Sequence, residues 1–364
     1  EELNYLVNNL GNSAGSSYFT TKDKYYKMAD GIDYAILQPE GKLDVERLLA
    51  CSGDEVYKYF NEIGLTNLVN WETSGNEMWF GGHFDGNGVT FAGMYSADKS
   101  AGLFATADGG AEFKNLAVVS SYIDGVDGNA RTGAIVGGTC GVKYGAGVAG
   151  TVTFDTIMVA NNYLHCYTNQ SNGAIVMGAC NDEEAVSINN AIVYGNASKY
   201  SNSGKAGLED KTMHLYGAVK NSINASLKST VTNSIILGTR PYYAWYDANM
   251  SGVESLENVY TDQPLNPYSQ VTYATTDLAA ITYDELIGSK AQSVVDALNN
   301  ANDEDVWYIG NSFDGVPSFK KANNMPGAYQ IAYNSAVVLD TYNDYGESTK
   351  DFGLYTTSLN FKNN

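Results

Sequence analysis

The densest group of aromatic side chains in the sequence lies between Pro241 and Asn249. Aromatic rings offer flat apolar faces on which the C–H face of a sugar can stack, and Tyr and Trp add a polar edge. Neighbouring amide and carboxylate groups can bond sugar hydroxyls. Burial of Tyr242 and Trp245 as loop core is the alternative, because aromatic residues are often buried. The residues assigned to this predicted carbohydrate-binding loop are Arg240, Tyr242, Tyr243, Trp245, Tyr246, Asp247 and Asn249.

Candidate catalytic residues are sparse. Acid–base chemistry on a sugar needs paired carboxylates, or a carboxylate beside a histidine or a cation. Asp155 falls within a repeated strand, but Lys114 and Asn189 stand at the matching positions of neighbouring repeats, and Arg131 is expected alone in a loop near Asp127. No nucleophile-elbow, Walker or Rossmann pattern occurs. We expect a non-catalytic protein, and a polysaccharide hydrolase or lyase is the least favoured class.

Metal ligands at characteristic spacings are also missing from the sequence. His83, His165 and His214 fall on different repeats without zinc spacing, so no metal and no other cofactor is predicted. His83 is expected to be a hydrogen-bonded surface histidine. The stretch Asp124–Asn129 has closely spaced oxygen donors but lacks the EF-hand order and its distal Glu. A solvated turn is favoured there, with calcium at this stretch or at Asp340–Glu347 as the alternative.

The charge balance narrows the classes of partner. Lys and Arg number 21 against 41 Asp and Glu, which gives a formal net charge of −20. Such a surface repels phosphate backbones and anionic polymers such as pectin or alginate. No apolar run reaches the ~18 residues that a membrane span needs. The sequence begins at Glu1 without a visible signal peptide, so we interpret it as a segment of a longer protein.

Two short patterns recur along the chain and decide the expected fold. The first is glycine followed by small and apolar residues, and its copies are Gly102–Phe104, Gly133–Cys140, Gly173–Cys180 and Gly217–Val219. The second has an apolar residue, then Asn or Thr two positions later, then more apolar residues. Its copies are Phe113–Val118, Phe154–Val159, Ile188–Val193, Val231–Ile236 and Leu256–Tyr260.

Each copy of the second pattern predicts a short strand that ends in a corner. Side chains alternate between the faces of a strand, so the first and third residues of a copy point the same way. Asparagine forms stacked amide ladders and tolerates the left-handed backbone of a tight corner. We therefore expect stacking in register of Asn115, Asn190 and Asn233, and one inner column of Phe113, Ile188 and Val231.

The repeats predict an all-β fold in which a parallel sheet coils on itself, with about four or five coils. This domain is assigned to residues 1–326, and residues 327–364 to a strand-rich C-terminal extension that could begin a further domain. Helical periodicity predicts insertions or caps at both ends of the coil. The expected helices are Glu2–Leu10, Leu43–Gly64 and Tyr283–Asn300, and Val306–Phe319 is expected to form a hairpin.

The repeats bring one pair of cysteines within reach of a disulfide bond. Cys140 and Cys180 occupy matching positions of two nearly identical copies. Neighbouring strands lie ~4.8 Å apart, which is within disulfide reach. A stacked pair of buried thiols is favoured over a bridge, because the chain has so few cysteines. Cys51 is expected on a helix and Cys166 on a strand.

The segment Phe80–Thr90 resembles the opening motif of GLUG-type right-handed parallel β-helix proteins, which read F-x-G-T-F-D-G-N-G-H-T-I there. The Gly-Leu-Phe coil of that family is matched by Gly102–Phe104, its K-N-L strand by Phe113–Leu116, and its G-x-x-V-G coil by Gly133–Gly138. The resemblance covers roughly residues 20 to 320, and Val89 stands where His is usual. It implies the β-helix fold and a secreted, cell-surface setting in adhesins and dockerin-bearing proteins of anaerobic gut bacteria, without one shared activity.

The expected function is non-catalytic binding of a neutral polysaccharide by a secreted bacterial surface protein. A starch-like α-glucan is the first choice, because the resemblance implies a polysaccharide-handling setting and the chain lacks positive charge. A structural or adhesive spacer within a large surface protein is the alternative. Other domains of the parent protein are the expected further partners.

Overall fold

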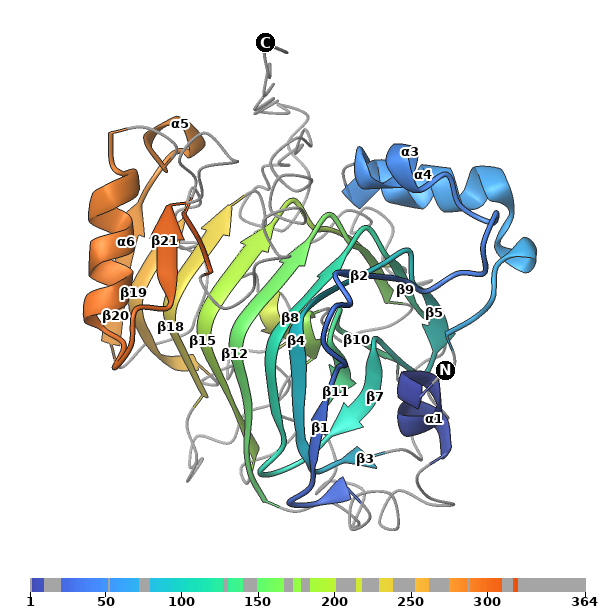
Figure 1. The fold of residues 1–364 in the computed structure, drawn as a ribbon, viewed down its shortest axis with the longest axis horizontal. Coiled ribbons are helices and arrows are strands. Elements are labelled where there is room, and N and C mark those ends of the chain that lie inside the picture. The colour runs from blue at the N-terminus through green and yellow to red at the C-terminus, as the bar shows by residue number, and fades with distance from the viewer. Residues whose placement is uncertain are drawn as a thin grey trace.

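The structure, a computed structural model, describes residues 2–9, 21–51, 53–71, 79–126, 130–139, 149–166, 173–177, 184–200, 214–217, 229–237, 253–261, 275–286, 289–309 and 317–319. The fold is rich in β-strands, as predicted, and its main sheets are parallel, with helices near both ends of the described chain (Figure 1). The repeats contain runs of apolar residues. Such runs are typical of parallel sheets, because their strands are usually covered on both faces.

The largest sheet, called the large sheet below, has nine strands. Its strands lie in the order in which they occur in the chain, so each new strand is added beside the previous one (Figure 1). β2 (Tyr34–Ile36) pairs with the second half of β4. The other strands, in spatial order, are β1 (Tyr25–Lys27), β4 (His83–Ala92), β8 (Glu112–Val119), β12 (Gly150–Ala160), β15 (Glu184–Tyr194), β18 (Ser229–Leu237), β19 (Val253–Thr261) and β20 (Thr275–Ala280).

Two smaller parallel sheets repeat the same sequential order. The four-stranded sheet holds β5 (Tyr95–Asp98), β9 (Tyr122–Gly125), β13 (Tyr163–Cys166) and β16 (Ala197–Tyr200). The five-stranded sheet holds β3 (Trp79–Phe80), β7 (Phe104–Ala107), β11 (Val136–Gly138), β14 (Gly173–Met177) and β17 (His214–Gly217). A short pair is formed by β6 (Ser100–Ala101) and β10 (Arg131–Thr132).

The chain visits these sheets in a fixed rotation. From β12 it passes to β13 in the four-stranded sheet, then to β14 in the five-stranded sheet, and returns to the large sheet as β15 beside β12. The same rotation runs from β8 to β12 and from β15 to β18. Each turn of the chain therefore lies against the turn before it.

The long strands bend where the sequence predicts a corner. Asn115, Asn190, Asn233 and Asn258 have positive φ angles of 54°, 52°, 49° and 53°, and Thr156, at the matching position of β12, has 53°. Strand register aligns these positions, since Asp155 lies opposite both Lys114 and Asn189, and Asn189 lies opposite Thr232. The predicted stacking of Asn115, Asn190 and Asn233 is therefore confirmed, and the reason is that Asn tolerates the left-handed region.

The amide ladder is diagonal rather than a simple column. Asn190 Nδ2 donates to Asp155 Oδ1 at 2.9 Å, which is the residue before the corner on the preceding strand. Asn115 donates in the same way to Asp85 at 3.0 Å. Asn258 instead donates to the corner residue Asn233, also through Nδ2, at 2.9 Å. β8, β15, β18 and β19 are thus each tied to the preceding strand by a side-chain bond as well as by the backbone.

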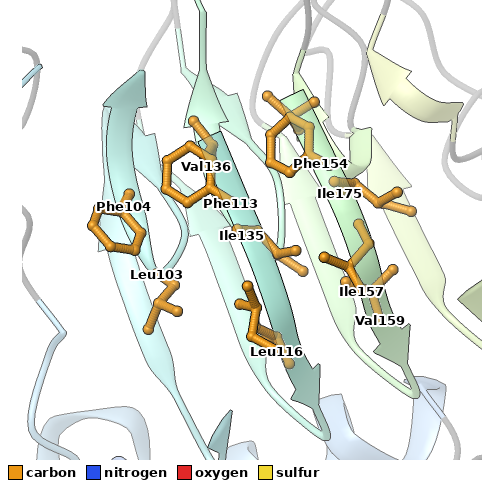
Figure 2. Packing of buried hydrophobic residues seen from close by; sticks show 14 of the residues in the cluster. Leu103, Phe104, Phe113, Leu116, Ile135, Val136, Phe154, Ile157, Val159 and Ile175 are labelled. Carbon is orange, nitrogen blue, oxygen red and sulfur yellow. The ribbon is translucent and has the colours of Figure 1, made fainter. Parts of the chain in front are cut away.

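The core lies between the sheets. The predicted inner column is confirmed, because Phe113, Ile188 and Val231 are buried and Phe154 bridges the register between the first two. The rings of Phe113 and Phe154 stack at 5.3 Å, and Phe104 of β7 approaches Phe113 at 5.0 Å (Figure 2). Burying each such ring contributes about 1.5–3 kcal/mol, so this column is a main source of stability.

Helices near the start of the chain pack against the main core and against the four-stranded sheet. Residues of α1 (Glu2–Asn9) enter the main core through Leu6 and Val7. The helix α4 (Gly53–Ile63) lies on the four-stranded sheet, where Tyr57 stacks on Tyr163 at 4.5 Å. Gly53 allows the close approach, because a Cβ there would lie 2.7 Å from the backbone nitrogen of Ala197.

The predicted helices are broken at two places. The expected helix Leu43–Gly64 consists of α3 (Val45–Leu49) and α4, with a short 3-10 turn at Leu65–Asn67. Cys51 follows the end of α3 and is not helical, which corrects its assignment. The expected helix Tyr283–Asn300 consists of α5 (Tyr283–Leu286) and α6 (Ala291–Asn300). Apolar spacing alone missed both breaks, although Ser52 precedes Gly53 at the first and Gly288 precedes Ser289 at the second, and Gly in particular has low helix propensity.

The cover formed by α6 and a hairpin lies on the outer face of the large sheet beyond the corners. The predicted hairpin is confirmed as β21 (Trp307–Ile309) paired with β22 (Pro317–Phe319). Trp307 is fully buried, and its ring N–H donates to Asn190 Oδ1 at 2.9 Å. Apolar residues of α6 and the hairpin form a second core with the outward side chains that follow the corners, among them Val119, Met158, Ile192 and Leu237.

Two further expectations are corrected, and two others concern residues outside the described ranges. Gly217 lies opposite Met177, not Gly173, so Gly217–Val219 is not a copy in register; the pairing is irregular at this point. Arg131 lies in β10 and is 2% exposed, rather than in a loop. Cys166 ends β13, as expected, whereas Cys140, Cys180 and residues 327–364 fall outside the described residues.

A candidate ligand-binding face on the large sheet

One face of the large sheet is covered by none of the elements that the structure describes, and it is formed by the half of each long strand that precedes its corner. In β12 the residues alternate there, with Val152 and Phe154 buried and Thr153 and Asp155 partly exposed. β15 and β18 show the same alternation. Beyond the corner both faces are buried, because α6 and the hairpin cover the outward side. The exposed half therefore presents only polar outward side chains over these three strands.

These outward side chains form two rows across the strands, which we call the polar strip. Parallel pairing places equivalent residues side by side, at a strand spacing of ~4.8 Å. The first row is Tyr25, His83, Glu112, Thr153, Ser187, Thr230 and Ser255. The second row is Lys27, Asp85, Lys114, Asp155, Asn189, Thr232 and Glu257.

The first row begins with an aromatic platform. Tyr25 is 80% exposed, and its ring stacks on that of His83 with centroids 4.3 Å apart and 9° between the planes. His83 Nδ1 lies 2.7 Å from Glu112 Oε2, and an ionised carboxylate accepts that bond. Glu112 thus orients the imidazole, which in turn supports the Tyr25 ring. The expectation that His83 is a hydrogen-bonded surface histidine is confirmed.

Charges alternate at the start of the second row. Lys27, Asp85, Lys114 and Asp155 follow one another in register. Asp155 Oδ1 accepts from Asn189 Nδ2 at 3.0 Å, in addition to its bond from the corner, and Asp85 Oδ1 accepts from the backbone N–H of Asn87 at 2.8 Å. Among the described carboxylates, none forms an ion pair with Lys114. Opposite charges side by side on neighbouring strands stabilise the stack.

The part of the strip on β15 and β18 is neutral and internally bonded, and Glu257 follows it on β19. Ser187 Oγ and Thr230 Oγ1 lie 3.2 Å apart, across neighbouring strands. Thr232 Oγ1 donates to Asn189 Oδ1 at 2.8 Å. These bonds fix hydroxyl and amide groups in place, and a fixed array of donors and acceptors suits a ligand that carries many hydroxyls.

A second polar cluster lies on the four-stranded sheet. His165 Nδ1 is 2.6 Å from Asp124 Oδ1, and Tyr122 donates its hydroxyl to Asp124 Oδ2 at 3.3 Å. Burial under α4 raises the pKa of Tyr122, and the Asp124 charge raises it further. Asp124 belongs to a strand, is largely buried and bonds a histidine, so the expectation of a solvated turn is wrong for this residue. The rest of the stretch, residues 127–129, lies beyond the described ranges.

Most of the residues assigned to the site from sequence lie outside what the structure describes. This holds for Arg240, Tyr242, Tyr243, Trp245, Tyr246, Asp247 and Asn249, and for Asp340–Glu347.

The polar strip itself was missed in the sequence, apart from Asp155, Lys114 and Asn189. The sequence pattern that could have revealed the strip is a polar residue on either side of each inner apolar residue, as His83 and Asp85 flank Phe84. The alignment of Asp85 with Lys114 on neighbouring strands was not evident from the sequence, because the strand pairing shifts register between Asp85 and Val89. Tyr25 carries no repeat signal at all, since β1 lies outside the repeats.

No group of three or more metal-ligating side chains is found within the described ranges. Among the helices that the structure describes, none has the length and apolar character to cross a bilayer. Comparison of this chain with protein-family models, with curated proteins and with solved structures found no match.

Proposed function

We propose that the three parallel sheets form one right-handed β-helix, with helical caps, related to the GLUG-type proteins. The sequential strand order of all three sheets and the repeated rotation of the chain among them support this reading. The opening motif supports it as well: Asn87 and Gly88 have positive φ angles of 52° and 82° and form an enlarged corner. A secreted bacterial cell-surface protein is the setting that this relationship implies.

The function we propose is non-catalytic binding of a neutral polysaccharide on the polar strip. The main observation in support is the double row of hydroxyl, amide and carboxylate side chains, which none of the described elements covers. The exposed Tyr25 ring lies at one end of these rows. A sugar ring can stack on Tyr25, while the rows bond hydroxyls of the following rings. The net charge of −20 argues against polyanionic glycans.

The loop Pro241–Asn249 stays the carbohydrate-binding site predicted from the sequence, with Trp245 as its main stacking ring. By analogy with base stacking on aromatic residues, one such ring contributes ~1–3 kcal/mol. A single contact of that size gives at best millimolar affinity, so useful binding needs several contacts along a polymer. A starch-like α-glucan remains the sequence-based choice for this loop.

Retardation in native gels that contain starch, xylan, mixed-linkage β-glucan or pectin tests the proposal. We expect retardation by at least one neutral polymer and none by pectin. Tyr25→Ala should weaken retardation without lowering the melting temperature, because the Tyr25 ring is largely exposed. Tyr34→Ala is a matched control, because Tyr34 is exposed on β2, off the strip.

A structural or adhesive spacer is the alternative function, and it predicts that no gel retards the protein. Retardation that Trp245→Ala abolishes but Tyr25→Ala leaves intact would place the glycan on the loop instead of the strip.

A further inference from the structure

The middle of the polar strip is straight and regular. The strands β8, β12, β15 and β18 pair without a register shift in the half that forms the strip. Glu112, Thr153, Ser187 and Thr230 therefore follow one line, and the second row follows a parallel line. Along each line the side chains repeat at the strand spacing of ~4.8 Å. The register shifts in the pairs β4–β8 and β18–β19 lie outside the two rows.

The two lines are separated by two residues along each strand, or about 7 Å. A pyranose ring carries hydroxyls along both of its edges, and one ring fits across this width. In an extended, ribbon-like chain successive rings advance by close to one strand spacing. Such a chain, lying across the strands, places one ring over each strand with a hydroxyl edge toward each row.

Each of these strands supplies both kinds of hydrogen-bonding group. β12 offers Thr153 and Asp155, and β15 offers Ser187 and Asn189. The cross-strand bonds from Ser187 to Thr230 and from Asn189 to Asp155 hold these groups in position before a ligand arrives. A pre-ordered array lowers the entropic cost of binding.

From this match we infer that the polar strip binds an extended β-1,4-linked neutral glycan that runs across the strands. The inference rests on the proposed function and specifies the class of neutral glycan that the strip binds. A coiled α-glucan curves away from a straight array and touches it only at intervals. A polyuronate is disfavoured by Glu112 and Asp155, because like charges repel at this distance.

Calorimetric titration with oligosaccharides of increasing length tests the inference. The probes are xylo- and cello-oligosaccharides, with malto-oligosaccharides of equal length as the matched comparison. Affinity for the β-linked series should rise with each added sugar and level off at about seven rings, because seven strands each contribute one residue to both rows. The malto-oligosaccharides should bind at least tenfold more weakly.

Two substitutions locate the contact. Thr153→Val removes a hydroxyl but keeps the branched shape, and Ser187→Ala removes the neighbouring hydroxyl of the same row. Each should weaken binding of the longest β-linked probe about three- to tenfold, the usual loss for one hydrogen bond. Ser293→Ala is the control, because Ser293 is exposed on α6, away from the strip.

Three results would overturn the inference. The first is stronger binding of malto-oligosaccharides than of both β-linked series, and the second is an affinity that does not depend on length. The third is unchanged binding in Thr153→Val and Ser187→Ala. In each case retardation by a neutral polymer would leave the proposed function standing. If no neutral glycan binds in gel or calorimeter, the proposed function fails together with the inference.

Discussion

Thr156 is the residue at which the diagonal ladder of the large sheet is interrupted. It has a φ of 53° and is 4% exposed, and a branched side chain in this region carries a strain of about 1–2 kcal/mol. At the other corners the Asn amide donates to an oxygen on the preceding strand, such as Asp85 or Asp155. At Thr156 the corresponding residue is Lys114, which has only donors. An asparagine here would face an ammonium group.

A pair of substitutions should therefore restore the ladder. Thr156→Asn alone is expected to raise the free energy of unfolding by about 1 kcal/mol, because it removes the strain of the branched side chain. Adding Lys114→Asn should give about 1 kcal/mol more, because the new corner amide then finds an acceptor. Chemical denaturation of the wild type, both single variants and the double variant measures the coupling. Strictly additive effects would contradict the ladder explanation.

Among the elements, the short helix α5 depends on one carboxylate at its start. Glu285 accepts from the backbone N–H of Thr282 at 3.0 Å and pairs with Lys290 at 2.9 Å. The backbone bond is the main cause that lowers the pKa of Glu285 from 4.5 to about 2. A lowered pKa in the folded state means that the stabilisation is complete above about pH 4.5 and disappears as the pH falls through 2.

The pH dependence of α5 gives a test at this scale. Glu285→Gln should lower the melting temperature at neutral pH, and the difference from the wild type should vanish near pH 2. The control is Glu40→Gln, which makes the same substitution at an exposed acid far from α5. A difference that stays constant down to the lowest pH would show that shape, not charge, matters at Glu285.

For the whole molecule, the sequential stacking of strands predicts a gradient of stability. β8, β12 and β15 are paired on both sides and belong to both core clusters, whereas β1 and β2 form one edge. In hydrogen exchange the amides of the three central strands should therefore exchange last, and those of β1 and β2 early.

The substitution Phe113→Ala makes this prediction sharper. It empties the space between Phe154, Phe104 and Phe80, and should cost about 3–5 kcal/mol. Because each strand contacts mainly its neighbours, protection should fall first in β4, β8 and β12 and last in β19 and β20. Equal loss of protection across all strands would instead indicate a single cooperative unit.

Features that arise from local physics follow from the amino-acid sequence alone. Alternation of side chains between strand faces placed Phe113, Ile188 and Val231 in the core. The tolerance of asparagine for positive φ placed the corners at Asn115 and Asn190. Both rules act within a few residues, so repeats along the chain were enough to reveal them.

Which polar side chains share a surface depends on the pairing of distant segments in the folded molecule. Tyr25 joins the strip because β1 pairs with β4 across more than fifty intervening residues. Asp85 aligns with Lys114 only after the enlarged corner at Asn87 absorbs extra residues. The uncovered face ends at the corners because α6 and the hairpin, from the far end of the described chain, cover the rest. Register and coverage depend on contacts between distant segments, and one strand's sequence does not specify its distant neighbours.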